Sequence, residues 1–296
     1  MVSKATCKGC GRVTLRLSWS QLRVHEECKQ KGYLSRQRKR ATLSDSRNFF
    51  PGNVTDRVVR DWLNRGDYTP GSLAPMVEEI MEREERNILE GKPDPDPKKH
   101  VEPGILKWRD REDKMRVFEE CTKAAELIEP ALQKYVVPYD FQPDFRFDAP
   151  LDIPHPQGGR ETVLLIGYMD ILVRDNNENW WVFDVKHTKD SNYWRKTIGQ
   201  LTFYDLAIFL TMGKPTSGTA LFQPLASPRI HPHKVTDQAR AEISQRFVSM
   251  ARDIWNEDHT PKQSNAGCNY CDFKHACTKF KPVRDERGKK RVSFSN

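Results

Sequence analysis

Two apolar stretches separated by a short polar turn constrain the fold of this chain more than any other feature. The first runs from Val163 to Val173 and the second from Trp180 to Lys186, and residues 175–179 between them read Asp-Asn-Asn-Glu-Asn. Runs rich in β-branched and aromatic residues are typical of strands, and Asn and Asp favour tight turns. The pattern therefore predicts an antiparallel hairpin.

Helical periodicity lies on both sides of this hairpin. Apolar residues at helical spacing predict that the first 135 residues are mostly helical, and we expect Pro130 to end the helix that precedes the strands. The order of the elements predicts a single α/β domain with a helical N-terminal part. The predicted helices are one through Trp19, Leu22 and Cys28 and those over 53–63, 72–89, 109–129, 191–212 and 236–255, and the further strands are 145–147 and 219–222.

The composition of the chain excludes several classes of protein. With 296 residues, of which 37% are hydrophobic and 10% aromatic, the chain can bury a large core, so neither a small disulfide-stapled fold nor wholesale disorder is expected. No apolar run approaches the roughly 20 residues that cross a bilayer, and the first seven residues lack the apolar centre of a signal peptide. We therefore expect a soluble, cytoplasmic protein.

Positive charge exceeds negative charge and is concentrated in two segments. The sequence holds 49 Lys and Arg against 41 Asp and Glu, which gives a net charge of +8. One basic cluster lies within 29–40 and another within 279–291, where Pro282 and Gly288 discourage regular structure. Such clusters fit a polyanionic partner such as DNA, but taken alone each is equally well explained as ordinary solvated surface.

Two carboxylates and a lysine are expected to meet at the end of the hairpin. Asp184 and Lys186 are two residues apart on one strand, so both side chains project from the same face. Asp170 on the preceding strand can face Asp184, because residues 171–183 suit two strand ends and a turn. Converging carboxylates suit Mg2+ or Mn2+, and a neighbouring lysine can stabilise the charge that develops on a phosphate.

The alternative interpretation of Asp184 and Lys186 is an ordinary surface ion pair. Two features favour a functional site. The pair ends an otherwise apolar strand, where unpaired charge is costly to bury. In addition, Gln200 and Tyr204 lie four residues apart on the next predicted helix, so an amide and a phenol share one helix face and can reach a phosphate or the lysine.

These motifs resemble those of a known group of nucleases. In order and spacing they are similar to the PD-(D/E)xK nucleases, specifically the RecB-like branch that contains the CRISPR-associated Cas-four exonucleases. The resemblance covers roughly residues 17 to 280. It implies a restriction-endonuclease-like fold, in which helices flank a mixed central sheet, and divalent-metal-dependent cleavage of DNA. The matching motifs are Gly-x-x-Asp at 167–170, Asp-Val-Lys at 184–186 and Gln-x-x-x-Tyr at 200–204.

The resemblance also implies roles for individual residues. Asp170 and Asp184 would bind Mg2+ or Mn2+, Val185 would contribute its carbonyl, and Lys186 would be the catalytic lysine. The branch usually has a further histidine ligand in a Gly-x-x-x-His pattern on an upstream helix, and the best counterpart here is Gly-x-x-x-Asp at 52–56. Asp56 can replace the imidazole, because carboxylates bind the same metals. Its alternative role is a first-turn acid that stabilises the helix N-terminus.

Three cysteines near the C-terminus follow the spacing C-x2-C-x5-C, at Cys268, Cys271 and Cys277. RecB-like nucleases that hold an iron-sulfur cluster carry this spacing and one distant cysteine near the N-terminus. The resemblance therefore implies Cys28 as the fourth ligand of a 4Fe-4S cluster. Such a cluster would tie the first helix to the last segment and make folding depend on the metal.

Zinc is the alternative interpretation of the cysteines. Cys7 and Cys10 form a C-x2-C pair that can bind Zn2+ together with Cys268 and Cys271, or together with His25 and Cys28. Either zinc site leaves Cys277 without a role, and free thiols are a third interpretation. Cys121 lies in an apolar helical stripe and is expected to be a core residue.

The sequence thus predicts a metal-dependent DNA exonuclease that acts on single strands or DNA ends. The alternatives are a catalytically silent DNA-binding protein of the same fold and an endonuclease of restriction or repair type. We expect an N-terminal extension over 1–16, a nuclease domain over 17–280 and a basic tail over 281–296. Within that domain the helical part ends near 135, the α/β core covers about 136–257 and the cysteine segment covers 258–280.

Overall fold

The computed structural model describes residues 5–6, 13–37, 46–90, 105–262, 268, 271–274, 276–277, 281–284 and 290–293. The chain divides into two compact units, each built from separate stretches. Unit 1 comprises 1–42, 147–167 and 238–296, and unit 2 comprises 43–146 and 168–237. Within the described residues, no helix is both long and apolar enough to cross a bilayer.

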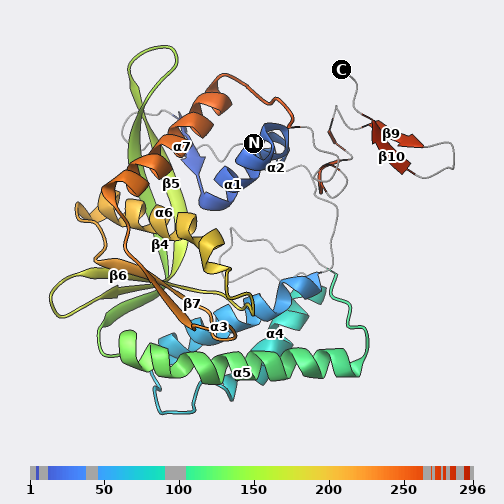
Figure 1. The fold of residues 1–296 in the computed structure, drawn as a ribbon, viewed down its shortest axis with the longest axis vertical. Coiled ribbons are helices and arrows are strands. Elements are labelled where there is room, and N and C mark those ends of the chain that lie inside the picture. Colours follow the sequence, from blue (N-terminus) through green and yellow to red (C-terminus); the bar gives the residue numbers. More distant parts are fainter. Residues whose placement is uncertain are drawn as a thin grey trace. The chain divides into compact units, whose positions relative to one another are not determined.

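Unit 2 contains the predicted hairpin. The end of strand β5 (Arg160–Arg174) pairs antiparallel with β6 (Trp180–Val185), with Ile171 opposite Phe183. β6 pairs in parallel with β7 (Gly218–Phe222), which pairs antiparallel with β8 (Ile230–His233). Helices flank this mixed sheet (Figure 1), so the predicted α/β fold class is confirmed. Strand β8 was not predicted, because its sequence Ile-His-Pro-His lacks a strand pattern.

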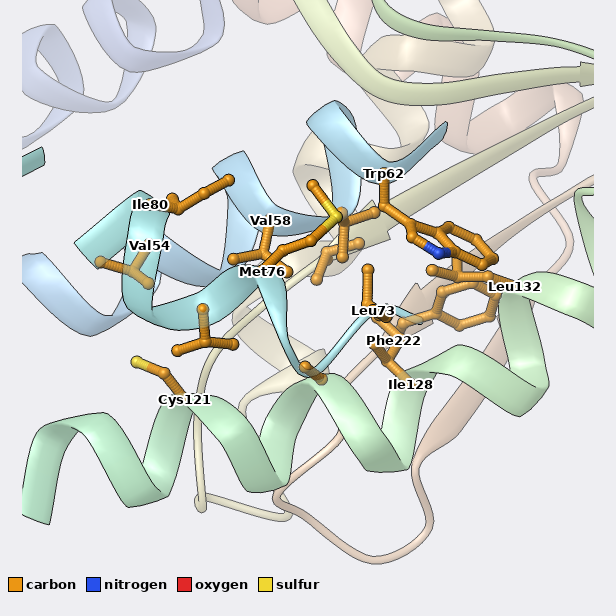
Figure 2. Packing of buried hydrophobic residues seen from close by; sticks show 14 of the residues in the cluster. Val54, Val58, Trp62, Leu73, Met76, Ile80, Cys121, Ile128, Leu132 and Phe222 are labelled. Carbon is orange, nitrogen blue, oxygen red and sulfur yellow. The ribbon is translucent and has the colours of Figure 1, made fainter. Parts of the chain in front are cut away.

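Three helices cover one face of this sheet. α3 (Phe50–Arg65), α4 (Met76–Glu90) and α5 (Arg111–Tyr135) enclose a core that also contains alternate sheet residues such as Phe183, Val185 and Phe222. Figure 2 shows side chains from α3, α4 and α5 converging with Phe222 of β7. A short 3-10 helix, η1 (Ser46–Asn48), precedes α3. On the opposite face of the sheet lies α6 (Trp194–Met212), which contacts β6, β7 and β8. Sheet residues on that face, including Val182 and Leu221, are buried.

Helix α5 corrects the prediction that Pro130 ends a helix. It continues through Pro130 to Tyr135. The reason lies in tertiary packing, because the apolar stripe extends past the proline: Ile128, Leu132 and Val136 are all fully buried in the core shared with α3 and α4. Burial of these side chains outweighs the loss of one backbone hydrogen bond.

Unit 1 contains the N-terminal helices. α1 (Trp19–Glu27) begins with a capping box in which Ser18 and Gln21 exchange hydrogen bonds, and α2 (Lys29–Arg36) follows after one residue. That residue, Cys28, has an extended backbone, so the single helix predicted through Cys28 is two helices. The two helices pack closely at Gly32, where an added Cβ would lie 3.0 Å from His25.

The remaining elements of unit 1 are one further helix and several strands. α7 (Asp237–Trp255) matches its prediction, and β3 (Arg16–Leu17) pairs in parallel with the early part of β5. In the tail, β9 (Lys281–Arg284) and β10 (Lys290–Ser293) form an antiparallel pair, which corrects the expectation that proline and glycine keep this segment irregular. β1 (Ala5–Thr6) pairs with β2 (Val13–Thr14). β4 (Asp140–Pro154) contains residues of both units and pairs with β5. It is much longer than the predicted strand over 145–147.

Candidate active site

Asp184 and Lys186 lie at the end of β6 in unit 2. Asp184 is completely buried, and the Nζ atom of Lys186 lies 2.7 Å from its Oδ2 atom. Lys186 directly follows the strand, and its backbone N–H donates to the carbonyl of Phe222, so the ladder with β7 continues. The predicted position of both side chains on one face is therefore confirmed.

Asp170 approaches this pair from β5. Its Oδ2 atom accepts a hydrogen bond of 2.8 Å from the backbone N–H of Val185 and lies 3.8 Å from Nζ of Lys186. The strand register accounts for this position, because one step beyond the pair of Ile171 and Phe183 brings Asp170 beside Asp184. The two carboxylates and the lysine thus meet where the sequence predicts.

The electrostatics of this group follow from burial and from like charges close together. Burial and the charge of Asp170 raise the pKa of Asp184, against the opposing effect of Lys186. Burial alone would lower the pKa of Lys186, but Asp184 and Asp170 raise it above its usual range, so this side chain remains a cation. Oδ1 of Asp184 is buried and accepts no hydrogen bond from any described residue.

Asp56 lies on α3, in the same unit. The helix begins at Phe50, so Asp56 belongs to its second turn, and the first turn contains no acidic residue. The dipole of a helix acts mainly within its first and last turns, so the role of a first-turn acid is not supported. Desolvation and the charges of Asp170 and Asp184 raise the pKa of Asp56, although the residue keeps an exposed surface. Asp56 therefore lies close enough to both carboxylates to interact with them.

Gln200 and Tyr204 lie one turn apart on α6, as predicted. Nε2 of Gln200 donates a hydrogen bond of 2.6 Å to the phenol oxygen of Tyr204, which is buried. Burial and the charges of Asp184 and Asp170 raise the pKa of Tyr204 well above its usual value. The phenol therefore stays protonated beside the carboxylates.

A hydrogen-bonded chain centred on His187 is the part of this region that sequence reasoning missed. Nδ1 of the buried His187 lies 2.8 Å from the hydroxyl of Thr55, and Nε2 lies 2.9 Å from a carboxylate oxygen of Glu120. The other oxygen of Glu120 binds Lys189. The chain ties α3, at the residue before Asp56, and α5 to the loop that carries Lys186. No local sequence pattern predicts these hydrogen bonds, because the residues that form them are far apart in sequence.

The cysteines lie in unit 1. Cys28 accepts a hydrogen bond of 3.4 Å from the backbone N–H of Lys262, and its charge contributes to raising the pKa of Cys271, after the larger effect of burial. Cys268, Cys271 and Cys277 are partly exposed and form no disulfide. The residues that the structure describes contain no group of three or more His, Cys, Asp or Glu arranged to hold a metal. Cys7 and Cys10 lie outside the described residues. Cys121 is buried on α5, as expected.

Comparison with known proteins identifies the family. The model of the PD-(D/E)XK nuclease superfamily matches residues 16–278, so the chain belongs to this superfamily, which acts on nucleic acids. Among solved structures, one described as "Putative exonuclease" from Eubacterium rectale is 14% identical over 90% of each chain, with a TM-score of 0.49. SSO0001 is 13% identical over 88% of this chain and 94% of its own, with a TM-score of 0.33. No curated protein sequence matches the chain.

The His187 chain generates a test of how the site is held together. Replacing His187 with Ala would remove one hydrogen-bond partner from the buried Thr55 and one from a carboxylate oxygen of Glu120, so we expect the free energy of unfolding to fall by about 1–3 kcal/mol. Lys189→Ala is the matched control. This change removes only the exposed ion pair between Lys189 and Glu120, and it should lower the free energy of unfolding by about 0.2–1 kcal/mol. Urea unfolding measures both, and equal losses in the two variants would contradict a tethering role for His187.

Proposed function

We propose that this protein is a divalent-metal-dependent DNA exonuclease that hydrolyses phosphodiester bonds on single strands or at DNA ends. One observation carries the proposal: a buried carboxylate and a second carboxylate lie 2.7 and 3.8 Å from the cationic Nζ atom of Lys186 at the end of β6. Membership of the nuclease superfamily supports the reaction class. The choice of DNA and of exonuclease action rests on the resemblance to the RecB-like branch.

The types of donor atom near the end of β6 support binding of a hard divalent cation, although among the described residues these side chains are not already arranged as a group of three that could hold a metal. Oδ1 of Asp184 is buried without a hydrogen-bond donor among the described residues, which is costly unless a cation satisfies it. Asp170 and Asp56 add carboxylate oxygens, and oxygen ligands are those that Mg2+ and Mn2+ prefer. We therefore assign Asp56, Asp170, Asp184 and the carbonyl of Val185 as ligands. A metal bound there would polarise the phosphate and lower the pKa of a coordinated water.

The side chains around these ligands support the same reaction. Lys186 remains protonated between Asp184 and Asp170, so its ammonium group can stabilise the negative charge that develops on a phosphate oxygen. Tyr204, held by Gln200, is a neutral phenol whose O–H can donate to a phosphate oxygen and whose oxygen can accept a hydrogen bond from the lysine. Both functions require side chains that are fixed before substrate binds, and burial of Tyr204 and Asp184 provides this.

Removing the lysine charge tests the assignment of the active site. Lys186→Ala should reduce DNA cleavage by several orders of magnitude, because transition-state stabilisation of several kcal/mol is lost, while DNA binding is largely retained. Cleavage of end-labelled single-stranded, double-stranded and circular DNA across a metal titration is the measurement. Near-wild-type cleavage by both Lys186→Ala and Asp184→Ala would refute the site. Cutting of circular DNA would indicate an endonuclease, and mobility shifts without products from the wild-type protein would indicate a silent DNA-binding protein.

Asp56 can be tested separately through its response to metal. If Asp56 binds the metal, Asp56→Asn should raise the Mg2+ concentration that gives the half-maximal rate, because an anionic ligand is replaced by a neutral one. Asp61→Asn on the same helix is the control, since Asp61 forms ion pairs with Arg60 and Arg83. An unchanged Mg2+ response in Asp56→Asn would exclude it as a ligand.

We also propose that Cys28, Cys268, Cys271 and Cys277 bind a 4Fe-4S cluster. The spacing of the last three and the interaction between Cys28 and Cys271 support this proposal. Four thiolates are the donor set that such a cluster requires, and bound there it would link α2 to the cysteine segment. Zinc at a site that includes Cys7 and Cys10 is the alternative.

Metal analysis distinguishes these assignments. Cys28→Ala and Cys271→Ala should each lose iron and become sensitive to proteolysis, because metal binding and folding are linked. Cys121→Ala, whose thiol is buried in unit 2, should retain iron at full stoichiometry. If zinc is the metal, the purified protein contains zinc and no iron, and Cys7→Ala releases it. Full iron content in Cys28→Ala would refute the cluster.

A further inference from the structure

A cleft of about 860 Å³ lies in unit 2 beside the loop that carries Lys186. Its walls come from three elements: helix α5, the loop that follows β6, and the loop between β7 and β8. Lys189 lines the cleft three residues after Lys186, and three residues of extended chain span at most about 11 Å. The cleft therefore begins within a few nucleotide steps of the proposed catalytic lysine.

The cleft is lined by more positive than negative side chains. Glu119 and Glu120 are its acidic residues, and Glu120 is already engaged by His187 and Lys189. Four cations line it, namely Arg116, Lys123, Lys189 and Arg229.

Two of these cations have no partner within the described part of the chain. Arg116 binds the buried Asp113, and Lys189 binds Glu120. Lys123 on α5 and Arg229 in the loop between β7 and β8 are exposed, and neither side chain forms an ion pair or hydrogen bond with a residue that the structure describes. Unneutralised cations that line one cleft from two different elements favour an anionic ligand.

The walls of the cleft are held in place without a ligand. Gln223 begins the loop between β7 and β8, and its backbone N–H donates a hydrogen bond of 2.7 Å to the carbonyl of Arg229. Nε2 of the same buried Gln223 donates to the carbonyl of Asp190, at 3.3 Å, in the loop that carries Lys186. Gln223 therefore joins Arg229 to the loop that carries Lys186.

The lining also indicates which part of a nucleic acid binds. The described lining contains no aromatic side chain, so it offers no platform on which bases can stack. Lysine and arginine contact phosphate groups without regard to sequence. The chemistry therefore fits the phosphate backbone of a nucleic acid and not its bases.

We propose that this cleft holds the phosphate backbone of the nucleic-acid strand being cleaved, with Lys123 and Arg229 each contacting a phosphate within a few nucleotides of the scissile one. This inference rests on the proposed nuclease function of the same unit. It adds a binding surface that the catalytic motifs do not contain.

The test measures how binding of a fluorescent single-stranded oligonucleotide depends on salt, in the presence of a chelator so that no cleavage occurs. Each lost phosphate contact should lower the magnitude of the slope of log K against log salt by about 0.7 for single strands. Lys123→Ala and Arg229→Ala should each show this change, and the double variant should show about 1.4. Thermal unfolding confirms that each variant is folded.

The matched control is the double variant Lys134→Ala and Lys214→Ala, which removes two exposed cations of unit 2 that do not line the cleft. Its slope should equal that of the wild type. An unchanged slope in the cleft variants would refute the proposal, and so would an equal change in the control, because the effect would then reflect net charge alone.

The outcome is separable from that of the proposed function. Cleavage by the wild-type protein with Mg2+ is measured in parallel. If the wild type cleaves and the cleft variants keep its slope, the cleft proposal fails and the nuclease function stands. If the wild type does not cleave and the slope still falls only in the cleft variants, the nuclease function fails and the cleft remains a binding surface for nucleic acid.

Discussion

The costliest group to bury in the candidate site of unit 2 is one carboxylate. Asp184 is completely removed from solvent, and moving a carboxylate out of water costs several kcal/mol even after the surroundings relax. The ammonium group of Lys186, 2.7 Å away, offsets part of this cost. A buried ion pair is often no more stabilising than apolar residues of similar volume. Stability alone therefore does not explain a charged pair here, whereas the binding of a cation and a phosphate that we propose would explain it.

Much of the fold could be predicted because it depends on local patterns. The hairpin follows from two apolar runs around an Asn-rich turn, and the helices follow from apolar residues at helical spacing. The errors occurred where tertiary packing overrides a local signal. Pro130 lies inside α5 because Ile128 and Leu132 belong to one buried stripe. Cys28 interrupts what reads as one helix, because close packing between α1 and α2 requires a turn between them.

The candidate site likewise contains residues that local patterns predict and residues that only the tertiary fold brings together. Asp184 and Lys186 could be placed on one face because side chains alternate along a strand, and Gln200 and Tyr204 because they lie one helical turn apart. The partners of His187 could not be predicted. Thr55 and Glu120 precede it by 132 and 67 residues, and nothing in the chain relates three separate elements before they fold. Contacts of this kind are visible only in three dimensions.

The loop 186–190 has a thermodynamic consequence. Its first residue donates a backbone hydrogen bond to Phe222, His187 is held from two sides, and its last carbonyl accepts from Gln223. Fixing the backbone of one residue costs roughly 1–2 kcal/mol of conformational entropy. In this loop the conformational entropy is lost when the protein folds. In the proposed function, binding of a substrate would then require little further ordering of this loop, so the interaction energy of each phosphate would remain available for affinity and for the chemical step.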